Sequence, residues 1–531
     1  MKAIFNPFLI DKKIDFYLIG ILLLIIGIII YKLPFLNLPY YWDEAWSYSA
    51  AIGKMYESGL SLMPGSIPAD NYRGHPLLFY FLAAGWMKIF GTSLISGHSF
   101  ALSISILLLL STYFFCKKFI SPVVGFVSVL FFSLQQLFLS QSTFVMPEMM
   151  LALWTILTLY FYLKRQKIQY IIFASFAVFT KESALTLPLA LFIMSFVENY
   201  FIQKKEWKII IKDLFFISVP VLLIGLFFII QRIKMGWFFF PEHVGLIKWH
   251  WSDFHNKAVV IWNFIFDLQS RAYISILFIV VITIFWKIYS WNERFVIALA
   301  ALIIPQLFID YINFETQIKF WILLISLLLF YKKVFYKMYE INFEHARFVN
   351  AAGLFVFIYI IFSALNFYTH RYLLIIFPLF FLIVFYYVFH ILENKPIVKI
   401  VLIFFALFMT IRQLGGHNRY GDDDTYVNDI LCHQEAIKYC EDNRLYDKLI
   451  CCDFLIAKDL ANPYAGYLKS NKVFLKTTYD INSNADYYIF KGSPYCSIKD
   501  FASIIQRNKL ERVKVIVYGF VRLEIYKRNN T

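Results

Sequence analysis

Long apolar segments recur along the chain as far as residue 413. A helix that crosses a bilayer needs about 20 mostly apolar residues. Thirteen segments reach or approach that length, at 15–33, 94–115, 121–139, 145–163, 168–180, 183–201, 213–231, 271–289, 294–312, 317–331, 348–366, 371–391 and 396–413. Hydrophobic residues make up 60% of the 531 residues, more than a soluble protein can bury. The sequence therefore predicts a polytopic α-helical membrane protein with about 13 spans.

Lysine and arginine residues cluster in alternate connections between these segments. The basic connections lie around 117–118, 164–167, 204–212, 287–294, 332–347 and 395–399. Short loops rich in these residues stay on the cytoplasmic side, so the other connections and the C-terminus are predicted to face outward. The net charge of +15 reflects these loops, and no nucleic-acid-binding motif accompanies it. The first segment lacks a small-residue cleavage site after it, so we expect a retained span rather than a signal peptide.

The composition changes at about residue 414. GGHNRYGDDDTYVND is a polar linker, residues 425–442 have the pattern of an amphipathic helix, and five segments have strand patterns: LICCDFL, KVFLKTTY, ADYYIFKG, VKVIVYGF and VRLEIYKR. We expect a membrane domain over 1–413 and a small extracytoplasmic α/β domain over 414–531. Five of the six cysteines lie in this tail. Cys432 and Cys440 would lie about 12 Å apart along one helix, too far to bridge, and buried thiols are at least as reasonable as a disulfide.

The first predicted outer loop, about 34–93, contains the stretch PYYWDEAWSY at 39–48. It places Asp43 and Glu44 among five aromatic residues beside the bilayer, where charge is costly. A partly desolvated carboxylate is more basic, which suits a general base near a reacting hydroxyl. The alternative is that Asp43 caps a helix that begins at Glu44. The same loop contains a short aromatic stretch, 76–90, which we expect to form a helix lying in the membrane interface.

Several cations lie on the same predicted face. They are Arg73, His75, Lys88, Lys181, Arg232, Lys234 and Arg371. A lipid-linked phosphate needs cations near the bilayer surface, whereas long basic side chains also anchor helices by reaching the headgroups. Lys181 and Arg371 each lie directly against an apolar run. His75 precedes Pro76, so it could instead mark a helix start.

Two further acids, Glu148 and Glu182, begin apolar runs on this face. Negative charge at a helix N-terminus compensates the helix dipole, and metal coordination is the alternative role. The loop MGWFFFPEHVGLIKWHWSDFH could stack on a sugar ring or form an interfacial aromatic belt. No Cys and His spacing has the pattern of a structural zinc site.

The order of these motifs resembles a known family. PYYWDEAWSY, GHPLLFYFLAAGWMKIFGTS, SQSTFVMPEMMLALWTILTLYFYL, FTKESALTLPLAL and YTHRYLLIIFPLFF are similar to motifs of the bacterial protein O-mannosyltransferase and aminoarabinose transferase superfamily. The resemblance covers roughly residues 15–400. It departs from the family where Leu77 stands in place of a second proline after His75 and Pro76. The resemblance implies the C-type glycosyltransferase (GT-C) fold in a bacterial inner membrane, with the active site on the outer face.

The resemblance also implies an inverting transfer from a polyprenyl-phosphate sugar to an acceptor hydroxyl. The acceptor could be a lipid, a glycan or a protein, and the remaining partners are membrane lipids, without nucleic acid. Asp43, with Glu44 beside it, maps onto the presumed base. Arg73, His75, Lys181, Arg371 and Tyr372 are expected to bind the donor phosphate. Tyr41, Trp42, Glu148 and Glu182 are expected to line the substrate site. No cofactor or metal is expected, although a divalent metal is compatible with the chemistry.

Three other functions fit a membrane protein with an outer domain. A polysaccharide polymerase or ligase would use an oligosaccharide donor on the same face. A flippase or transporter of lipid-linked sugars would carry charges deep in its spans and duplicated halves, neither of which is evident. A membrane sensor would leave the acids of the first outer loop without a role.

Overall fold

The structure is a computed structural model that describes residues 15–247, 250–268, 270–285, 290, 336, 339–340, 342–414, 424–470, 472–492 and 498–529. The segments predicted at 294–312 and 317–331 lie outside these residues. So does most of the polar linker that follows residue 414.

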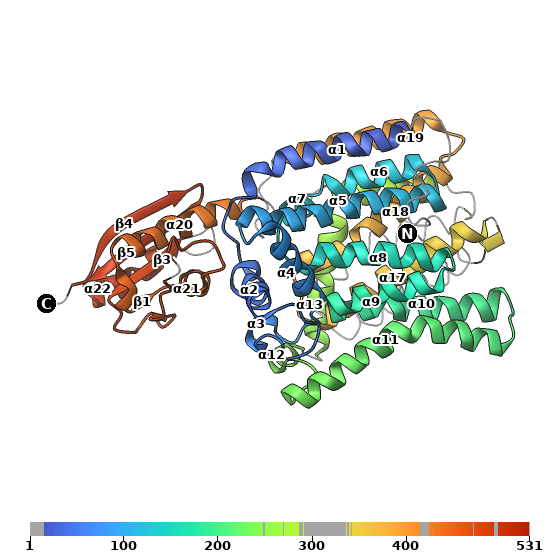
Figure 1. Cartoon of the computed structure of the whole chain (residues 1–531). Helices are drawn as coiled ribbons and strands as arrows, with labels where there is room; N and C mark the ends of the chain where they lie inside the picture. The colour runs from blue at the N-terminus through green and yellow to red at the C-terminus, as the bar shows by residue number, and fades with distance from the viewer. Residues whose placement is uncertain are drawn as a thin grey trace.

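A bundle of apolar helices forms the larger part of the described chain (Figure 1). Its helices are α1 (Phe16–Lys32), α5 (Leu94–Phe119), α6 (Pro122–Ser133), α7 (Gln136–Gln141), α8 (Pro147–Leu163), α9 (Lys167–Thr180), α10 (Thr186–Val197), α11 (Trp207–Met235), α13 (Trp251–Trp262), α14 (Arg271–Val280), α17 (Phe343–Leu365), α18 (Phe377–Ile391) and α19 (Pro396–Gln413). The polytopic helical class is confirmed, and the chain is a membrane protein.

The number of membrane spans differs from the sequence prediction. Among the described residues, six helices are long and apolar enough to cross a membrane, or seven if the pair bent by 81° between 251–266 and 271–280 counts as one. The segments expected at 121–139, 145–163, 168–180 and 371–391 contain helices of only 10–17 residues. The count of 13 is therefore not confirmed.

Local signals in the sequence set several helix starts. The side chains of Ser93 and Ser121 accept hydrogen bonds from backbone N–H groups in the first turns of α5 and α6. Pro122 and Pro147 occupy the first positions of α6 and α8, where a proline costs no hydrogen bond. The two serine side chains therefore satisfy backbone N–H groups at the ends of apolar helices, where lipid offers no hydrogen-bond partners.

The first loop packs over one end of the bundle, which we call the Asp43 end (Figure 1). It comprises η2 (Leu33–Phe35), η3 (Glu44–Tyr48), α2 (Ser49–Ser58), α3 (Ala69–Tyr72) and α4 (Leu78–Phe90). A helix, α4, is present in the stretch 76–90, and its expected place in the membrane interface stays a prediction. At Gly74 the φ of +74° and the closeness of Trp237, 2.9 Å from where a Cβ would stand, explain the glycine.

The opposite end carries basic connections. There α8 leads to α9 through Lys164 and Arg165, and η5 (Glu198–Ile202) leads to α11 through Lys204 and Lys205. Both turns use a left-handed residue, with φ of 57° at Arg165 and 50° at Lys204.

The C-terminal part forms a mixed five-stranded sheet with the strand order β2-β1-β3-β5-β4. The strands are β1 (Ile450–Cys451), β2 (Thr477–Thr478), β3 (Tyr487–Gly492), β4 (Leu510–Tyr518) and β5 (Val521–Arg528), and the helices are α20 (Tyr426–Asp442), α21 (Phe454–Ala461) and α22 (Ala502–Arg507). β1 pairs in parallel with β2 and β3, whereas β5 is antiparallel to β3 and β4. The predicted helix 425–442 and all five strands are confirmed, but LICCDFL yields only two strand residues before Asp453 caps α21.

No disulfide occurs among the described cysteines: Cys116, Cys432, Cys440, Cys451 and Cys452 are buried free thiols. Burial in an apolar core raises the pKa of the Cys440 thiol to about 12, so it is an inert packing group at neutral pH.

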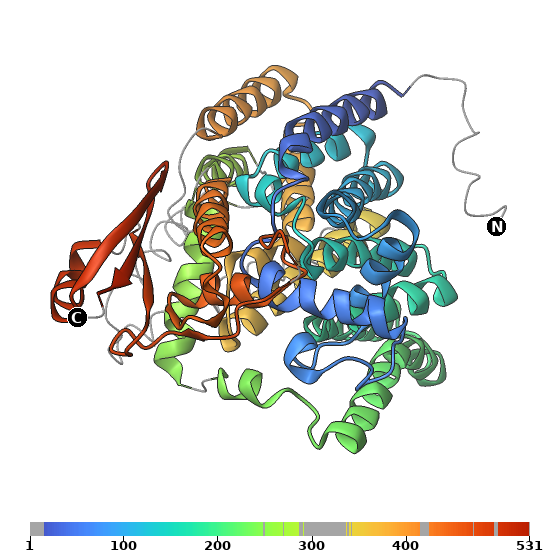
Figure 2. The ribbon, with the colours of Figure 1, turned by 60° about the vertical axis from the view of Figure 1, so that its left-hand side comes forward.

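The C-terminal part contacts the first loop at several points (Figure 2). The Asn462 side-chain amide donates to the carbonyl of Ala45 and, at 2.9 Å, to the hydroxyl of Ser49. The amide of Tyr40 donates to the carbonyl of Ala465 at 3.0 Å. These bonds join the C-terminal part directly to the turn that holds Asp43.

A buried ion pair adds to this junction. The ammonium of Lys32, at the end of α1, lies 2.7 Å from a carboxylate oxygen of Asp424 and is fully buried. Removal of one partner of a buried pair costs about 3–5 kcal/mol, because the other charge is left uncompensated. We expect Asp424→Asn to lower the melting temperature of the purified protein more than the double change Lys32→Met and Asp424→Asn. An equal loss in both variants would contradict a desolvated pair.

Candidate active site

Asp43 lies in a tightly wound turn of the first loop. The preceding residue, Trp42, has a φ of 53°, and η3 begins at Glu44 as a π-helical turn. The Asp43 side chain makes no capping bond to this helix. Instead its Oδ1 accepts from the indole Nε1 of Trp46 at 3.1 Å, and its Oδ2 pairs with the guanidinium of Arg371. The capping alternative for Asp43 is therefore not realised.

Arg371 reaches Asp43 from a different part of the chain. It lies in η8 (His370–Ile375), just before α18, and its side chain is 11% exposed against 23% for Asp43. Its Nε also lies 3.6 Å from Oε1 of Glu148. The guanidinium is thus held between two carboxylates.

Lys181 completes this group, which we call the Asp43 cluster: Asp43, Glu148, Lys181, Arg371 and Tyr372. The ammonium of Lys181 lies 3.0 Å from Oε1 of Glu148 and 3.9 Å from the centre of the Tyr372 ring. Oε2 of Glu148 is buried without a hydrogen-bond partner among the described residues. Oε1 of Glu148 is therefore shared by two cations, and the group brings two carboxylates and two cations together.

A second group lies beside the first, around His75. The Nδ1 of His75 lies 3.0 Å from a carboxylate oxygen of Glu182, and its ring centre is 5.0 Å from that of His243. Arg73 pairs with Glu242 at 2.7 Å and stacks 4.9 Å from the Trp46 ring. Because Trp46 also donates to Asp43, the two groups are connected. Arg73 and His75 nevertheless contact acids of their own and not the Asp43 cluster.

His243 has an altered titration. Burial, followed by the proximity of His75, lowers the pKa of His243 from 6.5 to about 3. As the pH falls below about 6.5, this histidine takes up a proton in the unfolded chain but not in the folded chain. The folded state therefore has its full stability relative to the unfolded state above pH 6.5 and loses part of it as the pH falls toward 3. We expect the melting temperature to fall less between about pH 8 and pH 5 in His243→Phe than in the wild type. Parallel curves would contradict this assignment.

Sequence reasoning missed two tyrosines between these groups. The rings of Tyr48 and Tyr80 stack with centres 5.7 Å apart and an interplanar angle of 19°, and both are buried. Tyr48 belongs to the same aromatic stretch as Asp43, whereas nothing local distinguishes Tyr80 from the other aromatic residues of α4.

Glu44, the expected partner of Asp43, lies outside the Asp43 cluster. Its side chain is 1% exposed, and its Oε1 accepts from the backbone amide of Val145 at 2.7 Å and lies 3.3 Å from Nε2 of His98. Its Oε2 accepts from the amide of Tyr41 at 3.2 Å. Both oxygens thus hold the loop in place, and the structure does not bring Glu44 together with the Asp43 cluster.

The remaining predicted residues are dispersed. The hydroxyl of Tyr41 donates to Asp429 at 2.8 Å, so Tyr41 faces the C-terminal part, and Trp42 is 49% exposed. Lys88 lies over the Tyr56 ring and Arg232 over the Phe238 ring. Among the described residues no three His, Cys, Asp or Glu side chains lie close enough to hold a metal ion.

Comparisons with known proteins agree with this architecture. No protein-family profile matches the chain, and no curated protein matches it in sequence. The crystal structure of ArnT from Cupriavidus metallidurans bound to undecaprenyl phosphate superposes with a TM-score of 0.52 over 97% of this chain and 98% of that chain, at 10% identity. The chain has the GT-C fold. The apo structure of the same ArnT covers 96% of this chain with a TM-score of 0.44 and 13% identity. Because the superposition with the first of these structures covers 97% of this chain, the shared fold includes the first loop, the bundle and the C-terminal sheet.

Proposed function

We propose that this protein is an inverting glycosyltransferase that moves a sugar from a polyprenyl-phosphate carrier to an acceptor hydroxyl. One observation carries the proposal: at one end of a helical membrane bundle the Asp43 carboxylate pairs with Arg371, and Glu148 links Arg371 to a second cation, Lys181. A carboxylate supplies a base, and the cations stabilise a departing phosphate. The GT-C fold and the undecaprenyl phosphate bound in ArnT support this donor class.

The reaction is a direct displacement at C1 of the sugar. Asp43 takes the proton of the acceptor hydroxyl while its oxygen forms a bond to C1 from the face opposite the phosphate. The bond between C1 and the phosphate oxygen breaks, and its electron pair leaves on the polyprenyl phosphate. Arg371 and Lys181 neutralise that charge where it develops. The configuration at C1 inverts because bond formation and departure occur on opposite faces.

The ion pair of Asp43 with Arg371 gives the reaction an order. Both oxygens of Asp43 have partners, Trp46 and Arg371, before any substrate is present. A donor phosphate would compete for Arg371, because guanidinium groups bind phosphate in a bidentate manner. Oδ2 of Asp43 would then be free to accept the proton of the acceptor. The base therefore becomes available only when the donor is bound.

The basic connections at the opposite end support an orientation for this site. Loops rich in lysine and arginine stay in the cytoplasm. We infer that the Asp43 end and the C-terminal part face the extracytoplasmic side of a bacterial inner membrane, where the C-terminal part borders the acceptor.

A donor comparison tests the proposal. Purified protein in lipid nanodiscs is incubated with radiolabelled undecaprenyl-phosphate sugars, with the corresponding nucleotide sugars, and with a panel of lipid, glycan and peptide acceptors. We expect transfer from the lipid-linked donors only, with release of undecaprenyl phosphate and inversion at C1 in the product. Transfer from nucleotide sugars at the same rate, or retention of configuration, would contradict the proposal.

A transporter of lipid-linked sugars is the alternative from another class. Most buried charged residues of the described apolar helices and their connections lie near helix ends: Lys32, Glu148, Lys181, Glu198, Arg271 and Arg347. This distribution favours a site at the membrane surface over a charged pathway through the bilayer. A polymerase or ligase with an oligosaccharide donor would use the same cluster, and a lipid-linked oligosaccharide added to the donors of the same experiment would separate it.

A further inference from the structure

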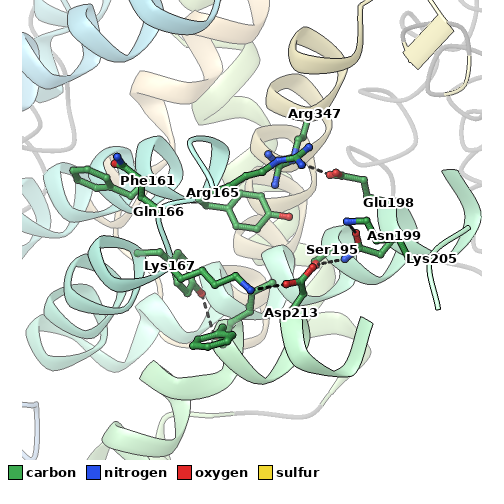
Figure 3. A pocket seen from close by; sticks show the side chains of 14 residues that line it. Phe161, Arg165, Gln166, Lys167, Ser195, Glu198, Asn199, Lys205, Asp213 and Arg347 are labelled. Carbon is green, nitrogen blue, oxygen red and sulfur yellow. Dashed lines mark hydrogen bonds and ion pairs between the residues drawn. The ribbon is translucent and has the colours of Figure 1, made fainter. Parts of the chain in front are cut away.

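A polar cavity lies at the end of the bundle opposite Asp43, and Figure 3 shows the residues that line it. Its volume is about 260 Å³, and its walls come from the C-terminal end of α8, the start of α9, the end of α10 with η5, and the starts of α11 and α17. Pockets for small molecules measure about 300–1,000 Å³, so this cavity has room for a headgroup and not for a whole lipid. None of its residues belongs to the Asp43 cluster.

The two acids of the cavity are already neutralised. Oε2 of Glu198 pairs with Nε of Arg347 at 2.8 Å, and Oε1 accepts from the amide of Gln203 at 2.6 Å. Oδ1 of Asp213 pairs with the ammonium of Lys167 at 2.8 Å. Each carboxylate therefore balances one cation of the wall.

Two cations remain without a counter-charge. Lys205 donates at 2.8 Å to the side-chain oxygen of Asn199, which is a neutral group. The Arg165 guanidinium makes no hydrogen bond or ion pair to any residue that the structure describes. It is held at the cavity by the left-handed turn between α8 and α9. The wall thus has an excess of two positive charges, which matches a phosphate group in charge and in hydrogen-bonding capacity.

Exposed aromatic residues place the cavity at the depth of lipid headgroups. Tyr200, Phe201 and Trp207 are 41%, 52% and 56% exposed and pack on one another beside the cavity wall, with the Tyr200 and Trp207 ring centres 5.3 Å apart. Trp and Tyr concentrate at membrane–water interfaces. A basic pocket between helices at that depth is suited to the headgroup of an anionic lipid.

We propose that this cavity binds the phosphate group of an anionic phospholipid, with Arg165 and Lys205 as its charged ligands and the Arg347–Glu198 pair as its rigid wall. The site is separate from the transferase chemistry. Its existence does not depend on the function proposed for the Asp43 end.

Native mass spectrometry and thermal unfolding of the purified full chain test this site. The probes are dioleoyl phosphatidic acid, dioleoyl phosphatidylglycerol, dioleoyl phosphatidylcholine and inorganic phosphate, each added to delipidated protein. The variant is Arg165→Gln with Lys205→Gln. The matched control is Lys204→Gln with Lys208→Gln, which removes the same charge from exposed positions outside the cavity wall.

We expect one retained anionic lipid and a raised melting temperature in the wild type and the control. In the Arg165 and Lys205 variant the affinity should fall about 25-fold, because each basic side chain near an anionic surface contributes about fivefold. Phosphatidylcholine should have little effect in any protein. An equal loss of lipid affinity in both double variants would overturn the site, because the lipid would then respond to the overall surface charge and not to the two cavity cations. Protection by inorganic phosphate as strong as that by the lipids would overturn the lipid as its ligand.

Discussion

We expect Asp43→Asn to reduce sugar transfer by about 10²–10⁴-fold, the usual contribution of a general base. The amide has nearly the same shape and can still accept from the Trp46 indole, so the local fold should persist. It cannot take the proton of the acceptor. The measurement is the rate of transfer from a radiolabelled undecaprenyl-phosphate sugar by purified protein.

The control for this variant is Asp70→Asn, which removes an exposed acid from α3 in the same loop. We expect it to transfer sugar at the rate of the wild type. Binding of undecaprenyl phosphate by Asp43→Asn should be retained or strengthened, because Arg371 loses a competing carboxylate. Equal transfer by Asp43→Asn and the wild type would exclude Asp43 as the base.

The second large effect is expected for Arg371→Gln. We expect transfer to fall about 10²–10³-fold, as when one group that stabilises a developing anion is removed. Donor binding should weaken as well, since in the proposed mechanism Arg371 binds the donor phosphate in both the ground state and the transition state. In contrast to Asp43→Asn, this variant should therefore bind undecaprenyl phosphate less tightly than the wild type.

Two further variants separate charge from geometry at this position. Arg371→Lys keeps the charge and loses the planar fork that contacts both Asp43 and Glu148, so we expect only partial recovery of transfer. Arg232→Gln, which removes a cation that lies over Phe238 near the same end, should leave transfer unchanged. A loss in Arg232→Gln as large as in Arg371→Gln would indicate a diffuse electrostatic effect and would contradict a specific phosphate ligand.

Several features of the site could be predicted because their signals are local. The doublet Asp43 and Glu44 follows the first apolar segment directly, and Lys181 and Arg371 each border an apolar run. Acids and cations at such positions are costly unless they have partners, which is why the sequence identified them as candidates. The five strands and the helix of the tail were predictable for the same reason, since their patterns repeat over a few residues.

The roles of neighbouring residues could not be separated in this way. Asp43 and Glu44 are adjacent in sequence, yet one faces Arg371 and the other turns inward to the amide of Val145. Their directions depend on the left-handed Trp42 and the π-helical turn that follows, which no residue pattern encodes. Likewise Arg73 and His75 were grouped with the phosphate ligands, although they pair with Glu242 and Glu182.

The sequence by itself determined the class of molecule, the alternation of basic loops, and the short list of charged groups at the membrane surface. These follow from hydrophobicity and charge, which are properties of each segment on its own. Only the tertiary structure decided which groups meet. Asp43 and Arg371 are 328 residues apart, and their contact depends on how helices between them pack side by side. Helix packing is set by side-chain shape across many interfaces, and that information is spread over the whole chain.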